Sequence, residues 1–338
     1  MSYTISPEIK EKSALILAEI KKSKSVLLHC HPSPDPDSVG SALAMKFAIE
    51  QLGGKATVIK GDSDIPTAFS YFPGVSEIVS KNFQEIDTSE FDLFIIQDSA
   101  LGGVSRITSA IIPETMKVIN IDHHRTNSGD GSINLVVPTY PATAQLLFDI
   151  FKEMNVTITP EIAVNLFLGI FTDTGGFKYE GTTTETFQVA SELAKINPNF
   201  SQIISKMENS STFDNMRFQG LALSSLEQFF DGRVVLSVVP YSEIVKHNIA
   251  PGSFSAGFIS SILNRIATTD IVGALIEFEP NQFRMSFRAH DSEKFDVSKL
   301  AASLGGGGHK LAAGAVVSAP AKDAKELVVE KIKELYNL

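Results

Sequence analysis

The 338-residue sequence contains one cysteine and no tryptophan, and none of its apolar runs approaches the roughly 20 residues that span a membrane. A single thiol, Cys30, cannot form an internal disulfide. Because Cys30 ends the apolar run SVLLHC, we expect a small buried side chain without a catalytic role. The first residues, MSYTISPEIKEK, lack the apolar stretch of a signal peptide. These absences predict no membrane contact and a cytoplasmic location.

Basic residues are also scarce, since 29 Lys and Arg stand against 39 Asp and Glu and leave a net charge of −10. Proteins that grip long duplexes carry clustered Lys and Arg, so this charge argues against long duplex nucleic acid as a partner. Short polyanions stay open, because divalent cations held by carboxylates can make one site locally positive. The missing tryptophan also disfavours an open channel that stacks the bases of a long single strand.

The length suggests two domains, and the pattern changes along the chain. Up to about residue 190, short β-rich runs alternate with longer amphipathic segments, which is typical of a mostly parallel sheet covered by helices. We expect the first domain to be doubly wound α/β. Its predicted strands lie at 25–30, 56–60, 91–97 and 117–121, and its predicted helices at 39–53 and 142–154.

The remainder of the chain predicts a smaller α+β domain, separated from the first by a cleft. Residues 191–214 are polar and carry no clear strand, which suits a partly helical connector. Three strands are then expected in RVVLSVV, DIVGALIEFE and QFRMSFRAH, followed by helical DVSKLAASL, a four-glycine run and an amphipathic end. The predicted parts are therefore 1–190, a connector over 191–214, and 215–338.

Acidic and histidine side chains follow the apolar runs of the first domain. In parallel sheets, ligands gather beyond the carboxyl ends of the strands, so these positions are the ones to inspect. The residues found there are His31, Asp35 and Asp37 after SVLLHC, Asp98 after FDLFIIQ, Asp122, His123 and His124 after KVINI, and Asp173 after NLFLGIFT.

So many carboxylates in one place would destabilise the fold unless cations compensate them. Carboxylate and imidazole form an oxygen-and-nitrogen ligand set that suits Mn²⁺ or a similar divalent ion. Taken singly, an Asp after a strand could equally cap the next helix, and a His in a turn could simply be solvated. Four such positions at equivalent strand ends predict a metal site.

In this order the motifs H-x-x-P-D-x-D, the strand-end Asp, D-H-H and T-D-T-G resemble those of the DHH phosphoesterase family. D-H-H alone carries little information, but the ordered set from position 31 to position 173 is specific. The resemblance implies two divalent ions, with Mn²⁺ expected first and Mg²⁺ or Co²⁺ as alternatives. It implies His31, Asp35 and Asp98 on one ion, and Asp37, Asp98, His123 and Asp173 on the other, so that Asp98 bridges.

The same resemblance implies roles for the remaining residues of the D-H-H motif. Two cations that share a hydroxide would lower its pKa and offset the charge that develops on phosphorus. His124 would stay off the metals and face the phosphate, where it either stabilises the oxyanion or protonates the leaving oxygen. Asp122 is expected to orient a neighbouring histidine.

A second signature lies near the C-terminus, where four glycines precede His309 and Lys310. The glycine density predicts a loop whose backbone N–H groups can approach a phosphate closely. As bare composition, such a run is more often a flexible connector. Followed by His and then A-A-G, it resembles the G-G-G-H motif of the DHH-associated C-terminal domain. The substrate contacts that this implies are Gly306, Gly307, Gly308, His309 and Lys310.

Two arginines just upstream are further candidates for binding phosphate. Arg284 and Arg288 lie four residues apart in a predicted strand and so share one face, and Arg288 is the better candidate. The resemblance is closest to the nanoRNase and 3′-phosphoadenosine 5′-phosphate (pAp) phosphatase group, whose matching run reads R-S-R. Here the run is Arg288, Ala289 and His290, so His290 departs from that pattern.

The resemblance covers nearly the whole chain and implies hydrolysis of short RNA to mononucleotides and of pAp to AMP. A phosphodiesterase for linear or cyclic dinucleotides is an alternative on the same metals, and a non-catalytic nucleotide-binding regulator is a second. A processive exonuclease and an inorganic pyrophosphatase are disfavoured, because there is no room for an extra nucleic-acid-binding domain and the pyrophosphatases lack the glycine signature. A homodimer is expected, since some family members pair through their DHH domains.

Overall fold

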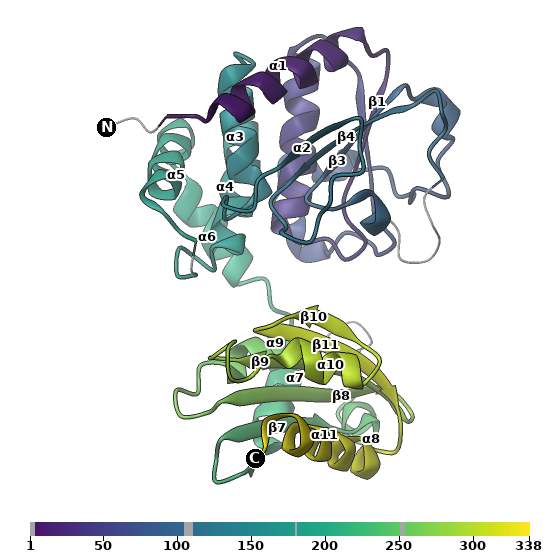
Figure 1. Ribbon diagram of the computed structural model, residues 1–338, viewed down its shortest axis with the longest axis vertical. Helices are drawn as coiled ribbons and strands as arrows, with labels where there is room; N and C mark the ends of the chain where they lie inside the picture. Colours follow the sequence, from purple (N-terminus) through teal and green to yellow (C-terminus); the bar gives the residue numbers. More distant parts are fainter. Residues whose placement is uncertain (1–3, 105–110, 180, 251–253) are drawn as a thin grey trace. The chain divides into compact units, whose positions relative to one another are not determined.

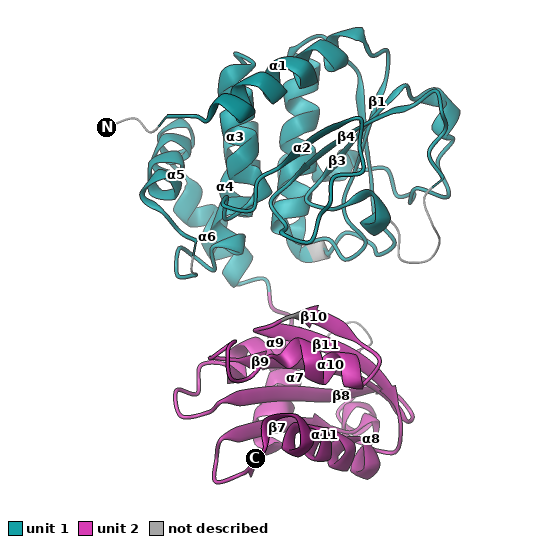
Figure 2. Ribbon diagram, in the orientation of Figure 1, with its two compact units in different colours: residues 1–210 teal, residues 211–338 magenta. Residues whose placement is uncertain are grey.

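The computed structural model describes residues 4–104, 111–179, 181–250 and 254–338, with only the backbone described for Thr67 and His309. The chain divides into two compact units, residues 1–210 and residues 211–338 (Figures 1 and 2). The division falls within the segment expected to connect two domains. That segment is mostly helical, since it contains the end of α5 (Thr184–Ile196) and all of α6 (Phe200–Glu208).

A five-stranded parallel sheet forms the centre of the first unit, in the order β2-β1-β3-β4-β5. Because the strand order reverses between β1 and β3, a crevice forms at their carboxyl ends. Four strands lie at predicted positions, whereas β5 was not predicted, because it is short and only its Leu135 is fully buried. The strands are β1 (Val26–His29), β2 (Ala56–Ile59), β3 (Leu93–Gln97), β4 (Lys117–Asp122) and β5 (Ile133–Val136).

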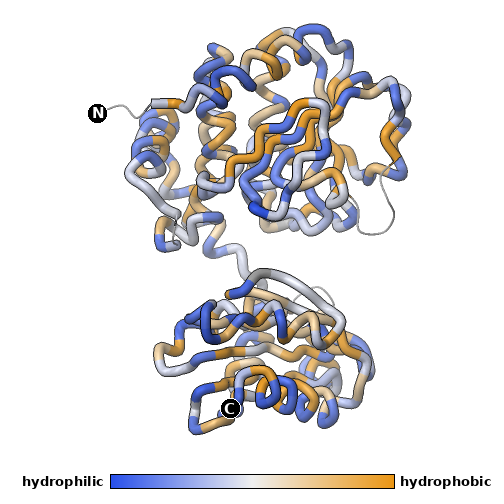
Figure 3. The backbone as a smooth tube through the Cα atoms, in the orientation of Figure 1, coloured by the Kyte–Doolittle hydropathy of each residue, from blue (hydrophilic) through white to orange (hydrophobic). Residues whose placement is uncertain are grey.

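The sheet is parallel and helices pack against it, so the predicted α/β class is confirmed. Alternate residues of each strand point to opposite faces, and Val26 and Leu28 join the core beneath the helices while Leu27 joins a second apolar cluster on the other face. Figure 3 shows the hydrophobic stretches along the central strands. The main helices besides α5 and α6 are α1 (Pro7–Lys22), α2 (Pro36–Gln51), α3 (Thr143–Glu153) and α4 (Pro160–Asp173).

Helix α4 corrects one prediction, because NLFLGIFT was expected to be a strand-like run ending in a strand-end Asp. Pro160 at the first turn and the Thr159 side chain, which accepts a hydrogen bond from the Ile162 N–H, start the helix. Every residue from Ile162 to Ile170 is buried. A helix buried on all sides has a continuous apolar sequence, which periodicity cannot distinguish from a buried strand.

The second unit contains a mixed six-stranded sheet in the order β10-β11-β9-β8-β7-β6, which confirms the α+β class. Of the strand pairs described in this unit, only β7 and β8 are parallel. Among the helices of the described residues in both units, none has the length and apolar character that a membrane crossing requires. The elements are α7 (Phe213–Ser224), β6 (Leu226–Phe229), β7 (Val234–Val239), α8 (Tyr241–Lys246), α9 (Ala256–Leu263), β8 (Ile271–Glu279), β9 (Gln282–Ala289), α10 (Val297–Ser303), β10 (Gly307–His309), β11 (Ala312–Ser318) and α11 (Ala321–Tyr336).

Strand β10 corrects a second prediction in part, since the glycine run was expected to be a loop, and Gly307 and Gly308 belong to a strand whereas Gly305 and Gly306 do not. It pairs with β11 in antiparallel register, with Gly307 opposite Gly314 and Gly308 opposite Ala313. A Cβ on Gly306 would lie 2.1 Å from the Gly314 carbonyl oxygen, and one on Gly308, where φ is +143°, would lie 2.5 Å from the Ala313 Cα. These two glycines therefore permit close strand packing, whereas a Cβ on Gly307 would meet nothing within 4 Å.

Candidate active site

The predicted metal-binding side chains meet at the carboxyl edge of the first sheet. His31 follows β1 and Asp98 follows β3, on the two sides of the crevice where the strand order reverses. Asp35 caps the N-terminus of α2, because its Oδ1 accepts a hydrogen bond from the Ser38 N–H at 2.9 Å. Asp173 is the last residue of α4, so it reaches the cluster from a helix end and not from a strand end as predicted.

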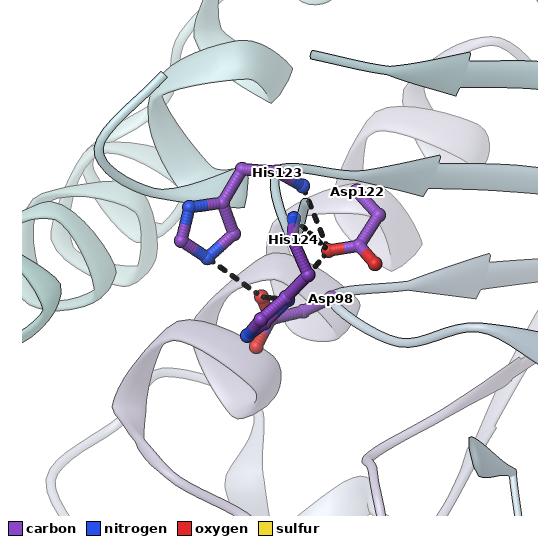
Figure 4. A group of neighbouring side chains, drawn as sticks. All are labelled: Asp98, Asp122, His123 and His124. Carbon is purple, nitrogen blue, oxygen red and sulfur yellow. Dashed lines mark hydrogen bonds and ion pairs between the residues drawn. The ribbon is translucent and has the colours of Figure 1, made fainter. Parts of the chain in front are cut away.

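The two carboxylate oxygens of Asp98 face two different histidines. Its Oδ2 lies 3.8 Å from His31 Nε2, which also lies 3.3 Å from Asp35 Oδ2. Its Oδ1 lies 3.5 Å from His123 Nε2, which also lies 3.3 Å from Asp173 Oδ2 (Figure 4 shows the side chains of Asp98 and His123). The carboxylate is therefore shared between two groups of potential ligands.

Asp37 completes the second group from the buried start of α2. Its carboxylate, the His123 ring and the Asp173 carboxylate offer atoms that all lie within 4.8 Å of one another. Its oxygens accept hydrogen bonds from the backbone N–H groups of Thr143 at 2.7 Å and Ala144 at 2.9 Å, at the start of α3. The positive end of α3 thus holds an aspartate from another helix in place.

The His123 ring fits a role as a metal ligand. Its Nδ1 lies 3.2 Å from the Tyr140 carbonyl oxygen, to which a protonated Nδ1 donates. Its Nε2 is buried and has no hydrogen-bond partner among the described residues. A buried ring nitrogen that faces carboxylates without a hydrogen bond, while a carbonyl fixes the opposite nitrogen, is the usual arrangement of a metal-binding histidine. Together with the surrounding carboxylates, it fits a divalent cation.

The charge balance of the cluster also favours cations. Burial raises the pKa of Asp98 well above its usual range, and burial together with Asp173 raises the pKa of Asp37 to about 7. Burial alone would lower the pKa of His123, but the Asp173 carboxylate, 3.3 Å from Nε2, and the charge of Asp37 raise that pKa to about 9. Without cations, the cluster retains protons that metal binding would displace.

Asp122 and His124 form a hydrogen-bonded pair at the edge of this cluster, where His124 Nδ1 lies 3.8 Å from Asp98 Oδ1. His124 Nδ1 lies 2.8 Å from Asp122 Oδ1, which also accepts the backbone N–H groups of His123 at 2.7 Å and His124 at 3.1 Å (Figure 4). The hydrogen bond to Asp122 raises the pKa of His124. The ring lines a cavity of about 240 Å³ together with His31 and Asp98. This geometry suits a residue that acts on a bound phosphate.

In the second unit, Arg288 and His309 lie in one row of the sheet, because both residues pair with Ala312, one from each side. The Arg288 guanidinium donates to the Ser286 hydroxyl at 3.0 Å. The side chain of His309 lies outside what the structure describes. Lys310 is exposed and its Nζ lies 3.5 Å from Glu293 Oε1. The sheet thus brings two of the predicted substrate residues together.

His290 does not take the place of a second arginine in this row. Its Nδ1 lies 3.0 Å from the Thr269 carbonyl oxygen and its Nε2 lies 2.7 Å from the Asn264 carbonyl oxygen, so the ring contacts the connection between α9 and β8. Arg284 is exposed and lines a groove together with Gly305 and Gly306. Arg284 is therefore the better source of a second positive charge.

Supporting residues were missed by the sequence reasoning. The Thr143 hydroxyl donates to Asp98 Oδ1 at 3.0 Å, the Tyr140 carbonyl fixes His123, and the Asn127 amide donates to Asp122 Oδ2 at 2.7 Å. These are common polar residues in connecting segments or at the start of a helix. Only the folded arrangement shows what they contact.

Comparisons with known proteins identify the two domains. Residues 25–170 match the N-terminal domain of the DHH family, and residues 233–337 match the DHHA1 domain. The chain is 29% identical over 330 residues to the bifunctional oligoribonuclease and PAP phosphatase NrnA of Thermus thermophilus, covering 97% of this chain and 95% of that protein. It is 24% identical to the protein of the same name in Bacillus subtilis, with coverage of 89% and 92%.

A solved structure shows the same fold. The crystal structure of an exopolyphosphatase-related protein from Bacteroides fragilis matches the whole of both chains with a TM-score of 0.88 and 23% identity. The two matched domains follow one another in the order that the motifs predicted, and the motif residues of the first domain meet at one edge of its sheet. The chain therefore belongs to the DHH family and carries a C-terminal DHHA1 domain.

Proposed function

We propose that this protein is a metal-dependent phosphoesterase that hydrolyses short oligoribonucleotides to mononucleotides and removes the 3′-phosphate of pAp to give AMP. The observation that carries the proposal is the Asp98 carboxylate, whose two oxygens face two groups of potential metal ligands beside a cavity. The substrate class follows from the relatives named oligoribonuclease and PAP phosphatase, which align with nearly the whole chain.

The proposed metal ligands form two groups that share one aspartate. Bound divalent ions would supply the Lewis acidity that lowers the pKa of water and offsets charge on the phosphate. Mn²⁺ is our first expectation, with Mg²⁺ or Co²⁺ as alternatives, because carboxylate and imidazole accept all three. The proposed ligands are His31, Asp35 and Asp98 for one ion. For the other they are Asp37, His123 and Asp173 together with Asp98, which lies 3.5 Å from His123.

His124 is the proposed acid of the reaction. When Asp122 accepts the Nδ1 proton, the other ring nitrogen of His124 is available for the substrate. A protonated Nε2 donates its proton to the oxygen that leaves as the P–O bond breaks, and the nucleoside hydroxyl departs neutral. The raised pKa of His124 keeps this proton available near neutral pH.

The C-terminal residues are proposed to bind the next phosphate or nucleotide of the substrate. An arginine such as Arg288 offers a planar fork of donors that matches a phosphate. Gly307 leaves open space over its backbone, and Lys310 is an exposed cation. The complete proposed set is Arg288, Gly306, Gly307, Gly308, His309 and Lys310. In this proposal the reaction takes place on residues 1–190, residues 215–338 bind the substrate, and residues 191–214 connect the two. A homodimer and a cytoplasmic location remain predictions.

The proposal is tested by incubating the protein with pAp, a 5′-phosphorylated RNA dinucleotide, a cyclic dinucleotide and a 24-mer RNA, each with Mn²⁺ or with EDTA. The variant Asp98→Asn keeps the size of the side chain but removes the shared charge. Asp323→Asn, on an exposed turn of α11, is the control. We expect Mn²⁺-dependent turnover of pAp and the dinucleotide, lost in Asp98→Asn and retained in the control.

Other outcomes separate the alternatives. Preference for the cyclic dinucleotide would retain the metal chemistry and replace the substrate with that of a dinucleotide phosphodiesterase. Preference for the 24-mer would instead indicate a long-strand exonuclease. If the wild-type protein binds Mn²⁺ but hydrolyses none of the four compounds, the proposal is wrong and the nucleotide-binding regulator replaces it.

A further inference from the structure

Asn127 lies three residues after His124 and joins the D-H-H segment to the strand beneath it. Its Nδ2 lies 2.7 Å from Asp122 Oδ2 and 2.7 Å from Asn120 Oδ1, and its Oδ1 accepts the Gly129 N–H at 2.9 Å. Both ends of the amide are therefore engaged. A flipped amide would set its oxygen against two acceptors, so the orientation of Asn127 is determined by its partners.

A buried amide beneath Asn127 anchors it. Asn120 is fully buried in β4, and its Nδ2 donates to the Ser99 carbonyl oxygen at 2.7 Å, which leaves its Oδ1 to accept from Asn127. Ser99 directly follows Asp98, and the Asn127 N–H donates to the His124 carbonyl oxygen at 3.1 Å. The two asparagines thus connect the ends of β3 and β4 through hydrogen bonds that do not depend on a bound ion.

This network determines how the Asp122 carboxylate is rotated. Its Oδ1 receives three donors from His123 and His124, and its Oδ2 receives the Asn127 amide. With both oxygens occupied, rotation would break a bond on each side of the carboxylate. Oδ1 must therefore face the His124 ring, so Nδ1 carries a proton in both the neutral and the protonated ring, and Nε2 is the nitrogen left to carry the second proton to the substrate.

We propose that Asn127 is a positioning residue for His124, which acts by holding Asp122 in the one rotation that sets the tautomer of the His124 ring. The inference rests on the proposed function for its catalytic consequence. Among the described residues, the hydrogen bonds of the Asn127 side chain go to Ser99, Asn120, Asp122 and Gly129, and none goes to the six proposed metal ligands. Metal binding is therefore expected to be independent of Asn127.

Two substitutions and one control test this role. Asn127→Asp preserves the shape but places a carboxylate against Asp122 and Asn120, and Asn127→Ala removes the amide. Asn134→Asp is the matched control, because Asn134 is also partly buried in this segment but bonds to the backbone of Gly131. Calorimetry of each metal-free protein measures its Mn²⁺ affinity, which we expect to be unchanged in all three variants. The Mn²⁺-loaded proteins are then used for the kinetics.

The kinetic readout compares two leaving groups. With the RNA dinucleotide, whose leaving oxygen needs a proton, we expect kcat to fall by about 10- to 100-fold in both Asn127 variants, with little change in KM. With bis(p-nitrophenyl) phosphate, whose phenolate leaves without a proton, kcat should stay near the wild-type value. An equal loss on both substrates, a parallel loss of Mn²⁺ affinity, or no loss on RNA would overturn the inference.

A spectroscopic readout works without turnover. We label the histidines with ¹⁵N, add Mg²⁺ and record the long-range ¹H–¹⁵N spectrum. His124 should be protonated on Nδ1 in the wild type and in the control. In the Asn127 variants, the proton should no longer be confined to Nδ1. The same tautomer in all proteins would refute the positioning role. If the wild type hydrolyses neither RNA nor pAp, the proposed function fails, and this spectrum still decides the role of Asn127.

Discussion

Metal binding to the DHH cluster should release protons, and lowering the pH should weaken it. Asp37 is fully buried, and burial together with Asp173 raises its pKa to about 7, while the pKa of His123 is about 9. A carboxylic acid and an imidazolium cannot bind a cation until they lose their protons. Protons therefore compete with the metal below the pKa of each group, and the Mn²⁺ affinity rises with pH through this window.

The size of the effect follows from these pKa values. At pH 6 a carboxyl group with a pKa of about 7 is about nine-tenths protonated, and at pH 8 it is about nine-tenths ionised. Asp37 alone should therefore make Mn²⁺ binding about tenfold tighter at pH 8 than at pH 6, a difference of roughly 1.4 kcal/mol. The proton on His123 adds to this difference in the same direction. We also expect Mn²⁺ binding to release about one more proton from Asp37 at pH 6 than at pH 8.

Isothermal titration calorimetry of metal-free protein with Mn²⁺ measures both quantities. Titrations at each pH in two buffers with different ionisation enthalpies give the number of protons released and the affinity. The variant Asp323→Asn, outside the cluster, should behave as the wild type does. Equal affinity at pH 6 and pH 8 with no proton release would refute the reasoning, because the buried carboxyls would then be ionised without a metal.

The stability of the metal-free protein should respond in the opposite direction. A carboxyl whose pKa is higher in the folded state stabilises that state fully below the ordinary pKa of about 4, and this contribution is lost as the pH rises to about 7. The melting temperature of the metal-free first unit should therefore fall between pH 6 and pH 8, while the gain on adding Mn²⁺ grows. A Mn²⁺-induced gain that is larger at pH 6 would contradict this.

Two further changes test the packing and the support of the site. Gly40→Ala would place a Cβ 2.3 Å from the Asn165 carbonyl oxygen between α2 and α4, so denaturant unfolding should show a free energy of unfolding lower by about 1–3 kcal/mol. Gly220→Ala lies in open space on α7 and should raise the free energy of unfolding by up to about 1 kcal/mol. Thr143→Val removes the hydroxyl that donates to Asp98, and calorimetry should show Mn²⁺ binding weakened about 10- to 100-fold. Thr143→Ser keeps the hydroxyl and should bind Mn²⁺ about as tightly as the wild type. Equal affinities in the two variants would exclude this role of the hydroxyl.

Much of the first unit was predictable from the sequence because its signals are local. Buried parallel strands are short apolar runs, and the polar residues that follow them mark one edge of the sheet. This was enough to place four strands and to single out Asp98 and the D-H-H segment. The same signal failed at α4, since a helix buried on all sides has no polar face to reveal its period, and Asp173 was assigned to the wrong kind of element.

The glycine run shows the limit of composition. Four glycines predict a loop when they are considered alone. In the structure Gly306 and Gly308 lie where the neighbouring strand leaves no space for a Cβ, and β10 forms because β11 is available as a partner. Strand pairing of this kind depends on residues elsewhere in the chain, and for β10 the partner is the small-residue strand that contains Gly314.

By itself, the sequence determined the class of the two domains, the order of the motifs and the types of ligand, because periodicity and side-chain chemistry are properties of neighbouring residues. Only the tertiary structure decided how those ligands meet. Asp98, at a φ of +56°, turns its two oxygens to histidines that follow different strands, and Asn127 reaches Asp122 through a turn. Such contacts join residues that fixed backbone geometry brings together, and no local pattern in the sequence encodes their distances or directions.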